Sequence, residues 1–312
     1  MTSHRRRRFI RAAATAAALS TLLAVPATHD AAAPFRALFI SQLSAQQGLP
    51  PRVTIRLAAE DQTQRLELAD GSRLIGRVVG DGDPVEFELA SGSVLLVARE
   101  TIRGLTTVEG RVENGTFWRD DPSHNRLFFG PTGRTVGKGH GYVAVFEAIF
   151  PSISYGFHDR ITLGGGTLLI GDFEGSHPVW FVPKFNLFQT DKGAMSVGAL
   201  LLNAGNDWAR IVYGVGTVGS KERSVTAGVG FGSAGDNGGL DVTVGQLGAL
   251  VRVHENLALM TENYLRSHES EEVAILGGGV RFIGDRLTAD LGVAIPVEDP
   301  ILLPLVNFVW NW

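Results

Sequence analysis

The last ten residues of the chain, from Leu303 to Trp312, constrain the fold more than any other segment. Their pattern alternates, so a strand here places Val306, Phe308, Trp310 and Trp312 on one face. A soluble domain normally covers such an aromatic face. A strand that faces lipid can leave it exposed, with the tryptophans at the level of the headgroups. The segment therefore predicts a membrane-spanning β-strand.

This ending resembles the C-terminal assembly signal of bacterial outer-membrane β-barrels, in which the last residue is usually aromatic. The resemblance implies that Phe308, Trp310 and Trp312 are the assembly signal and that the barrel-assembly machinery is a partner.

Composition is compatible with such a barrel. Outside the N-terminus, no stretch gives 18 uncharged apolar residues in a row, which excludes a helical membrane protein. A transmembrane barrel escapes hydropathy analysis because only alternate residues of its strands are apolar. The chain has 312 residues, enough for two domains, and no Cys, so it forms no disulfides.

Residues 1–27 are predicted to be an export signal that is cleaved near Ala27. A basic start precedes an alanine-rich apolar run from Ala12 to Val25, and an N-terminal anchor helix is the alternative. The start is similar to a twin-arginine signal, except that Arg5 stands where Ser or Thr is usual. We favour the general secretory route, because a membrane barrel should not cross the inner membrane folded. Removing five Arg leaves 23 basic and 32 acidic residues, a net charge of −9, which argues against nucleic-acid binding.

Two zones precede the predicted barrel. Residues 28–50 lack periodicity and are expected to be a linker. Residues 51–115 contain short alternating strands separated by Asp70-Gly71, Asp81-Gly82 and Ser91-Gly92 turns. The order of strands and glycines resembles small SH3-like or Sm-like barrels. We therefore expect a small periplasmic β domain that contacts a periplasmic protein or peptidoglycan.

The zone from 118 to 312 is predicted to form an antiparallel transmembrane β-barrel, and twelve strands fit the even number found in bacterial single-chain barrels. The predicted strands are Arg126–Phe129 with its extension, Gly141–Phe157, Ile161–Ile170, Val179–Phe188, Ala194–Leu202, Ala209–Val218, Val225–Gly232, Asp241–Val253, Leu257–Arg266, Val273–Ile283, Leu287–Ile295 and Leu303–Trp312.

Two classes of connection alternate between these strands. Those after even-numbered strands are tight and charged, as in His158–Arg160 and Gly284–Arg286. Those after odd-numbered strands are richer in Gly, Pro and polar residues, as in Gly133–His140 and Ser233–Gly239. Strict alternation indicates two distinct ends of a barrel. The chain finishes at the tight-turn end, which faces the periplasm in outer-membrane barrels, and the small domain enters there.

Charges within the strands are expected to face the lumen, because an Arg or Lys on the lipid face near the midplane costs about 2–4 kcal/mol. The mixed signs suggest ion pairs that brace a narrow lumen, and a polar solute path lined by the same groups is the alternative. The predicted inward charges are Glu147, Lys184, Arg210, Glu262, Arg266, Arg281 and Asp290. The same register places Ala209, Ile211, Tyr213 and Val215 toward lipid.

Other motifs carry little weight. Gly214 to Gly219 fits a dinucleotide-binding pattern, but no helix follows. Gly130–Gly139 fails the phosphate-loop pattern at Thr132 and Gly139. The mid-strand runs Gly164–Gly166 and Gly277–Gly279 indicate strand curvature, or close approach of a bulky side chain or ligand. We predict no catalytic, cofactor-binding or metal-binding residues, since His and Ser in the loops show no triad or ligand spacing.

The segment from Arg126 to Gly166 resembles uncharacterised exported bacterial β-barrel proteins. The resemblance rests on Phe128-Phe129-Gly130-Pro131-Thr132-Gly133, Lys138-Gly-His-Gly-Tyr142 and Tyr155-Gly-Phe-His-Asp159. It implies a barrel fold and an outer-membrane location but no activity.

We therefore expect an outer-membrane barrel in contact with outer-membrane lipid that is structural or a narrow, porin-like channel. The alternatives are a soluble secreted or surface β-protein and, third, an outer-membrane hydrolase.

Overall fold

The computed structural model describes residues 53–59, 62–169, 177–204, 207–234, 242–268 and 271–312. The predicted export signal and linker lie outside these residues. The chain divides into two compact units, Met1–Val108 and Glu109–Trp312. Among the described residues, no helix is long and apolar enough to cross a membrane.

The first unit is a five-stranded antiparallel sheet in the order β4-β3-β2-β1-β5. A short 3-10 helix at Arg99–Thr101 links β4 to β5. Alternate side chains of the sheet build a small core around Leu66, Val78 and Phe87. Its strands are β1 (Thr63–Leu68), β2 (Arg73–Gly80), β3 (Val85–Leu89), β4 (Val94–Val97) and β5 (Ile102–Val108).

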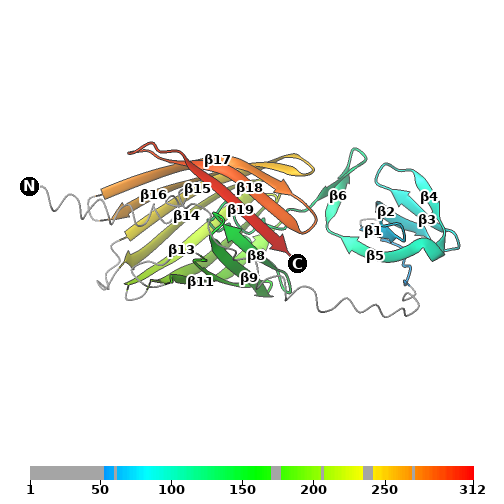
Figure 1. Cartoon of the computed structure of the whole chain (residues 1–312), viewed down its shortest axis with the longest axis horizontal. Coiled ribbons are helices and arrows are strands. Elements are labelled where there is room, and N and C mark those ends of the chain that lie inside the picture. The colour runs from blue at the N-terminus through cyan, green and yellow to red at the C-terminus, as the bar shows by residue number, and fades with distance from the viewer. Residues whose placement is uncertain (1–52, 60–61, 170–176, 205–206, 235–241, 269–270) are drawn as a thin grey trace, which may run out of the picture. The chain divides into compact units, whose positions relative to one another are not determined.

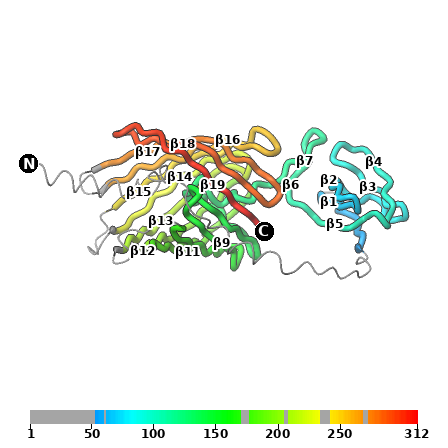
Figure 2. Tube along the Cα trace, viewed as in Figure 1, coloured from blue at the N-terminus to red at the C-terminus, as the bar shows by residue number. Residues whose placement is uncertain are grey.

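The second unit begins with the hairpin of β6 (Gly110–Glu113) and β7 (Thr116–Arg119). A closed antiparallel barrel of twelve strands follows within the described residues, which confirms the predicted fold (Figures 1 and 2). Its strands are β8 (Gly141–Phe146), β9 (Phe150–His158), β10 (Ile161–Thr167), β11 (Val179–Thr190), β12 (Gly193–Ala204), β13 (Asp207–Gly219), β14 (Arg223–Ala234), β15 (Val242–His254), β16 (Leu257–His268), β17 (Glu271–Ile283), β18 (Leu287–Pro296) and β19 (Leu303–Asn311).

The strand total agrees with the prediction, but two of the assignments are wrong. Arg126–Phe129 is not a wall strand, and the predicted strand Gly141–Phe157 is the hairpin of β8 and β9. This hairpin turns at Glu147 and Ala148, which have positive φ values of 50° and 60°. The turn contains no Gly, Pro, Asn or Asp, so it carries no residue that usually marks a turn.

The barrel closes between its first and last strands. Asn307–Asn311 of β19 pair with Tyr142–Phe146 of β8. At the tight-turn end, Gly141 and Trp312 exchange backbone hydrogen bonds of 3.1 and 3.0 Å. At the other end, which we call the loop end, the Glu147 amide donates to the Val306 carbonyl over 2.8 Å. Hydrogen bonds therefore close the seam along its whole length.

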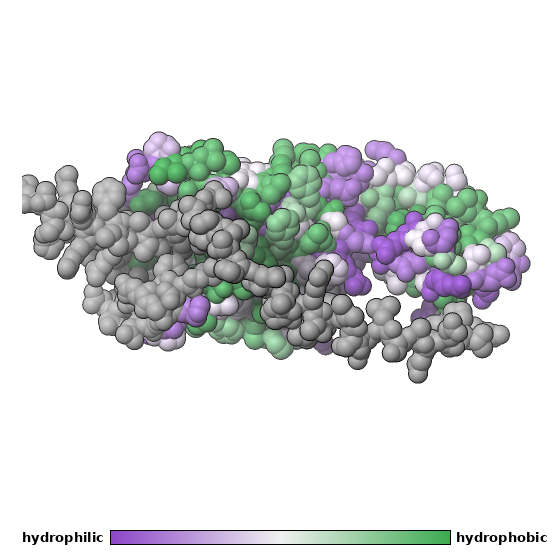
Figure 3. Space-filling model, viewed as in Figure 1, coloured by the Kyte–Doolittle hydropathy of each residue, from purple (hydrophilic) through white to green (hydrophobic). Residues whose placement is uncertain are grey.

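The outer surface of the wall is apolar and exposed, as a lipid-facing surface is. Val225, Leu276, Leu291 and Phe308 are each more than two-fifths exposed, although a soluble protein would bury such residues. Much of the wall that is visible in Figure 3 has this hydrophobic colouring. The outward residues of β14, β17, β18 and β19 agree with the predicted faces.

Strand β13 has the opposite orientation from the one predicted. Val215 is buried at 2% exposure and Val212 is 56% exposed, so the odd-numbered positions face inward. Ile211 and Tyr213 therefore belong to the lumen. The alternation had two possible registers here, because Ile, Tyr and Val are acceptable on either side of the wall.

Candidate functional site

The lumen contains a segment of the chain itself, residues 121–136, which we call the plug. None of these sixteen described residues is exposed. The plug enters and leaves at the tight-turn end. Asp120, just before it, pairs with Lys221 of a tight turn at 2.7 Å, and the amide of Lys138, just after it, donates to Asp159 of another.

Four buried charges tie the plug to β17 and β18. Arg281, with 0% exposure, donates to Asp290 over 2.7 Å and to Asp121 of the plug over 2.9 Å. Arg126 of the plug donates to the other Asp290 oxygen over 2.6 Å. Two cations and two anions thus form a neutral cluster, which offsets the cost of taking charges out of water.

Further N–H groups of Arg281 donate hydrogen bonds to carbonyl groups of the plug backbone. Its guanidinium donates to the carbonyls of Ser123 and Leu127 over 3.0 and 2.7 Å. Asn307 donates to the carbonyl of Phe128 over 3.1 Å. An irregular segment has no internal ladder to satisfy its carbonyl groups, so the wall supplies donors for them.

Lys184 and Glu262 also provide hydrogen-bond partners for the backbone of other parts of the plug. The Lys184 ammonium donates to the carbonyls of Asn125 and Arg134 over 3.1 and 2.6 Å. The Glu262 carboxylate accepts from the amides of Phe129 and Gly130 over 3.1 and 2.9 Å. The cation therefore holds carbonyl groups and the anion holds amide groups, each opposite the backbone group that complements its charge.

The plug tip, Phe128–Pro131, reaches inward glycines and the aromatic side of the lumen. A Cβ on Gly292 would lie 2.9 Å from the Phe128 ring, and a Cβ on Gly248 would overlap Leu127. These two inward glycines make room for the plug side chains. Gln246 donates to the Pro131 carbonyl over 3.3 Å, and beyond this contact the plug turns back.

The seven predicted inward charges have different positions. Lys184, Glu262, Arg281 and Asp290 are buried and contact the plug, as described above. Arg266 is half-buried on the inward face of β16, on the loop-end side of Glu262. Glu147 lies in the β8–β9 turn and accepts from the Val306 amide over 3.1 Å.

Arg210 is a correction. It is exposed on the outward face of β13, and its guanidinium lies over the ring of Trp208 at 5.8 Å. The position is three residues from the start of the strand, near the loop end, where an aromatic belt is usual and a charge on the outer face costs little.

Sequence reasoning missed the plug and its own polar residues, Asp121, Arg126 and Arg134. Two signals could have found it. The assigned strand Arg126–Phe129 has four residues, whereas a membrane-spanning strand needs about nine to eleven. It also ends in Gly130-Pro131, and proline interrupts a wall strand.

The residues that carry the resemblance to exported barrel proteins form the plug tip, its exit and the first hairpin. Among the described residues, no group of three His, Asp or Glu side chains could hold a metal ion.

No protein-family model and no curated protein matches the chain. Solved structures of barrels resemble it at low similarity. A KdgM porin in complex with disordered oligogalacturonate is 8% identical, with 55% of this chain and 95% of that chain covered and a TM-score of 0.41. A NanC porin is 8% identical, with coverages of 55% and 97% and a TM-score of 0.40. A loop L8 deletion mutant of OmpT, an outer membrane protein of Vibrio cholerae, is 11% identical, with coverages of 81% and 97% and a TM-score of 0.35.

Proposed function

We propose that the protein is an outer-membrane β-barrel of porin-like architecture whose lumen is closed by its own plug. The cluster of Arg281, Asp290, Arg126 and Asp121 carries this proposal. It anchors the plug across the lumen through charges that have almost no exposure to solvent. A lumen open to ions would hydrate these groups instead.

The wall and the predicted export signal support this location. The apolar outer surface fits lipid, and the tight-turn end would face the periplasm together with the small β domain of residues 51–115. That domain would be available to a periplasmic protein or to peptidoglycan. We assign no chemistry to the barrel.

Conductance in planar bilayers tests the closed channel. We expect little or no conductance from the full-length protein, and clear channel openings from a variant in which residues 121–136 are replaced by a Gly/Ser linker of equal length. A wild-type conductance equal to that of the linker variant would contradict the proposal.

A disulfide provides the matched control for plug movement. The hydroxyl oxygens of Ser123 in the plug and Thr288 in β18 lie 2.9 Å apart, and the chain has no Cys to compete. The variant Ser123→Cys/Thr288→Cys should bridge the plug to the wall. It should be silent when oxidised, and reduction should restore the wild-type trace. If the oxidised variant conducts as the linker variant does, current does not pass where the plug lies.

Phe308, Trp310 and Trp312 are proposed as the assembly signal. Deleting Phe308–Trp312 leaves only the Asn307–Phe146 pair of the β8–β19 seam. We expect the truncated chain to lose membrane insertion and heat-modifiable gel mobility. A deletion of the charged residues Glu298 and Asp299, in the β18–β19 connection, is the control and should assemble normally. Normal assembly of the truncated chain would contradict the proposed signal.

A further inference from the structure

The lumen on the loop-end side of the plug differs from the part that the plug fills. It contains a cavity of about 250 Å³ between the plug tip and strands β11 to β16. Its side walls are apolar, and they include Val182, Leu200, Ile211, Val215 and Val244. An aqueous channel has a polar interior, so this surface is not suited to hold water.

Two polar side chains that line the cavity, Gln246 and Tyr264, lie at its floor and are hydrogen-bonded, and a third, Tyr213, has a buried hydroxyl that finds no partner among the described residues. Gln246 donates to the Pro131 carbonyl, and the Tyr264 hydroxyl donates to Glu262, which itself holds the plug amides. The floor therefore offers no charge toward the cavity. A molecule that fits here must be uncharged and mainly apolar.

The cavity is lined by glycines on one side. Gly228 and Gly230 of β14 face inward, and β13 side chains lie over them, because an added Cβ would meet Val215 at 3.4 Å and Ile211 at 2.8 Å. Tyr213 does not fill the cavity, because its ring lies across the inward Gly198 of the neighbouring strand. A side chain at Gly230 would collide with Ile211 and one at Gly228 would crowd Val215, so the lining on this side of the cavity depends on glycine at both positions.

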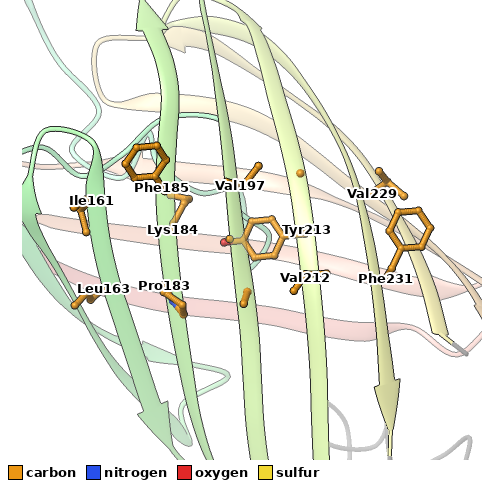
Figure 4. A pocket seen from close by; sticks show the side chains of 13 residues that line it. Ile161, Leu163, Pro183, Lys184, Phe185, Val197, Val212, Tyr213, Val229 and Phe231 are labelled. Atoms are coloured by element: carbon orange, nitrogen blue, oxygen red, sulfur yellow. The ribbon is translucent and has the colours of Figure 1, made fainter. Parts of the chain in front are cut away.

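A second hollow of about 640 Å³ lies on the outer face of the same wall (Figure 4). Phe185, Val212 and Phe231 of this groove are all exposed outward. The groove and the cavity share Tyr213, Gly214 and Val229. The ladder from β12 to β14 is unbroken here, so the backbone separates the two hollows.

We propose that the lumen cavity is a binding site for one small uncharged apolar molecule, such as a medium-chain alkane or a simple aromatic hydrocarbon. An apolar cavity of about 150 Å³ can take up benzene, so this larger cavity has room for a longer hydrocarbon. The proposal rests on the proposed function only in that both need the barrel to be folded in a membrane.

Photo-crosslinking tests the site directly. The full-length protein in lipid nanodiscs is irradiated with a diazirine derivative of decane, and adducts are located by mass spectrometry. We expect adducts on the inward residues Val182, Leu200 and Val244 that excess decane competes away. Adducts on outward residues come from dissolved probe and should not saturate.

Two neighbouring residues on opposite faces give the matched variants. Ile211→Trp fills the cavity and should reduce the inward adducts at least about tenfold, equivalent to about 1.4 kcal/mol. Val212→Trp changes only the outer groove and should leave them unchanged. Heat-modifiable mobility shows whether each variant folds, and Val244→Phe replaces Ile211→Trp if that variant does not fold.

Inward residues that remain unlabelled in the wild type would overturn the site, as would inward adducts that Ile211→Trp does not reduce. Labelling confined to the outer face would mean that the probe contacts the protein only as a lipid does. These results are independent of the conductance test. A silent barrel without inward adducts would remove the cavity proposal alone, whereas a conducting wild type with saturable adducts would remove only the closed channel.

Discussion

The two halves of the lumen follow different chemistry although the same strands build both. Toward the tight turns, β17 contributes Arg281 to the lumen, and toward the loop end it contributes Ile275. Strand β11 likewise changes from Lys184 to Val182. The polar half faces a piece of irregular backbone that needs hydrogen-bond partners, whereas the apolar half faces a cavity. What a barrel strand presents inward therefore depends on what occupies the lumen at that depth.

The inward glycines of the two halves also have different neighbours. Gly248 and Gly292 face the polar half, where side chains of the plug fill the space that they leave. Gly228 and Gly230 face the apolar half, where Val215 and Ile211 of the neighbouring strand lie over them beside the cavity. The same residue type thus accommodates side chains of the plug at one depth and side chains of the wall at another.

Among variants that distinguish the two halves of the lumen, Arg281→Met should lower the free energy of unfolding most. The substitution leaves Asp290 and Asp121 with Arg126 as their one remaining cation in the cluster, and breaking a buried ion pair costs about 3–5 kcal/mol. We expect the free energy of unfolding in detergent, measured by urea titration, to fall by about that amount.

Leu200→Met is the comparison variant in the apolar half. A swap between apolar residues of similar volume should cost less than about 1.5 kcal/mol there. The double variant Arg281→Met/Asp290→Asn removes one charge of each sign. Its loss in free energy of unfolding should therefore be smaller than the sum of the losses in the two single variants. Equal losses for Arg281→Met and Leu200→Met would mean that the charge cluster does not set the stability of the polar half.

Much of the wall was predictable, because lipid imposes a rule on every outward residue. The turn alternation and the apolar faces of β14, β17, β18 and β19 follow from that rule, and so does the inward placement of Arg281 and Asp290. Arg210 is an exception to this rule, because a charge near the loop end can face outward beside Trp208. The orientation of β13 was predicted wrongly because both of its faces are apolar, one toward lipid and the other toward the cavity.

The plug could not be predicted from periodicity. Its residues do not alternate, since each is positioned by a different wall strand and not by a neighbour in a ladder. Arg126 and Asp121 acquire their partners from Asp290 and Arg281, which lie about 160 positions further along the chain. Sequence reasoning could place one side of these ion pairs in the lumen but had no pattern with which to find the other.

A smaller effect on the polar half is expected from acid. The Nδ1–H of His124 in the plug donates to the Asp121 carbonyl oxygen over 2.8 Å, because a carbonyl oxygen can only accept. Burial, with a contribution from nearby Lys221, lowers the pKa of His124 from 6.5 to about 4. Between these values the unfolded chain binds a proton that the folded chain does not. The folded state is therefore fully stable above pH 6.5 and loses stability as the pH falls toward 4.

The substitution His124→Gln isolates this contribution, because Gln keeps a donor for the Asp121 carbonyl but does not titrate. The thermal midpoint of the wild type should fall between neutral pH and about pH 5, and that of His124→Gln should fall less. His158→Gln, at an exposed position beside a tight turn, should behave as the wild type does. If the wild type and His124→Gln lose stability equally, the acid response comes from groups other than His124. A loss confined to the wild type would show that the polar half of the lumen, and not the apolar half, is the part of the barrel that senses pH.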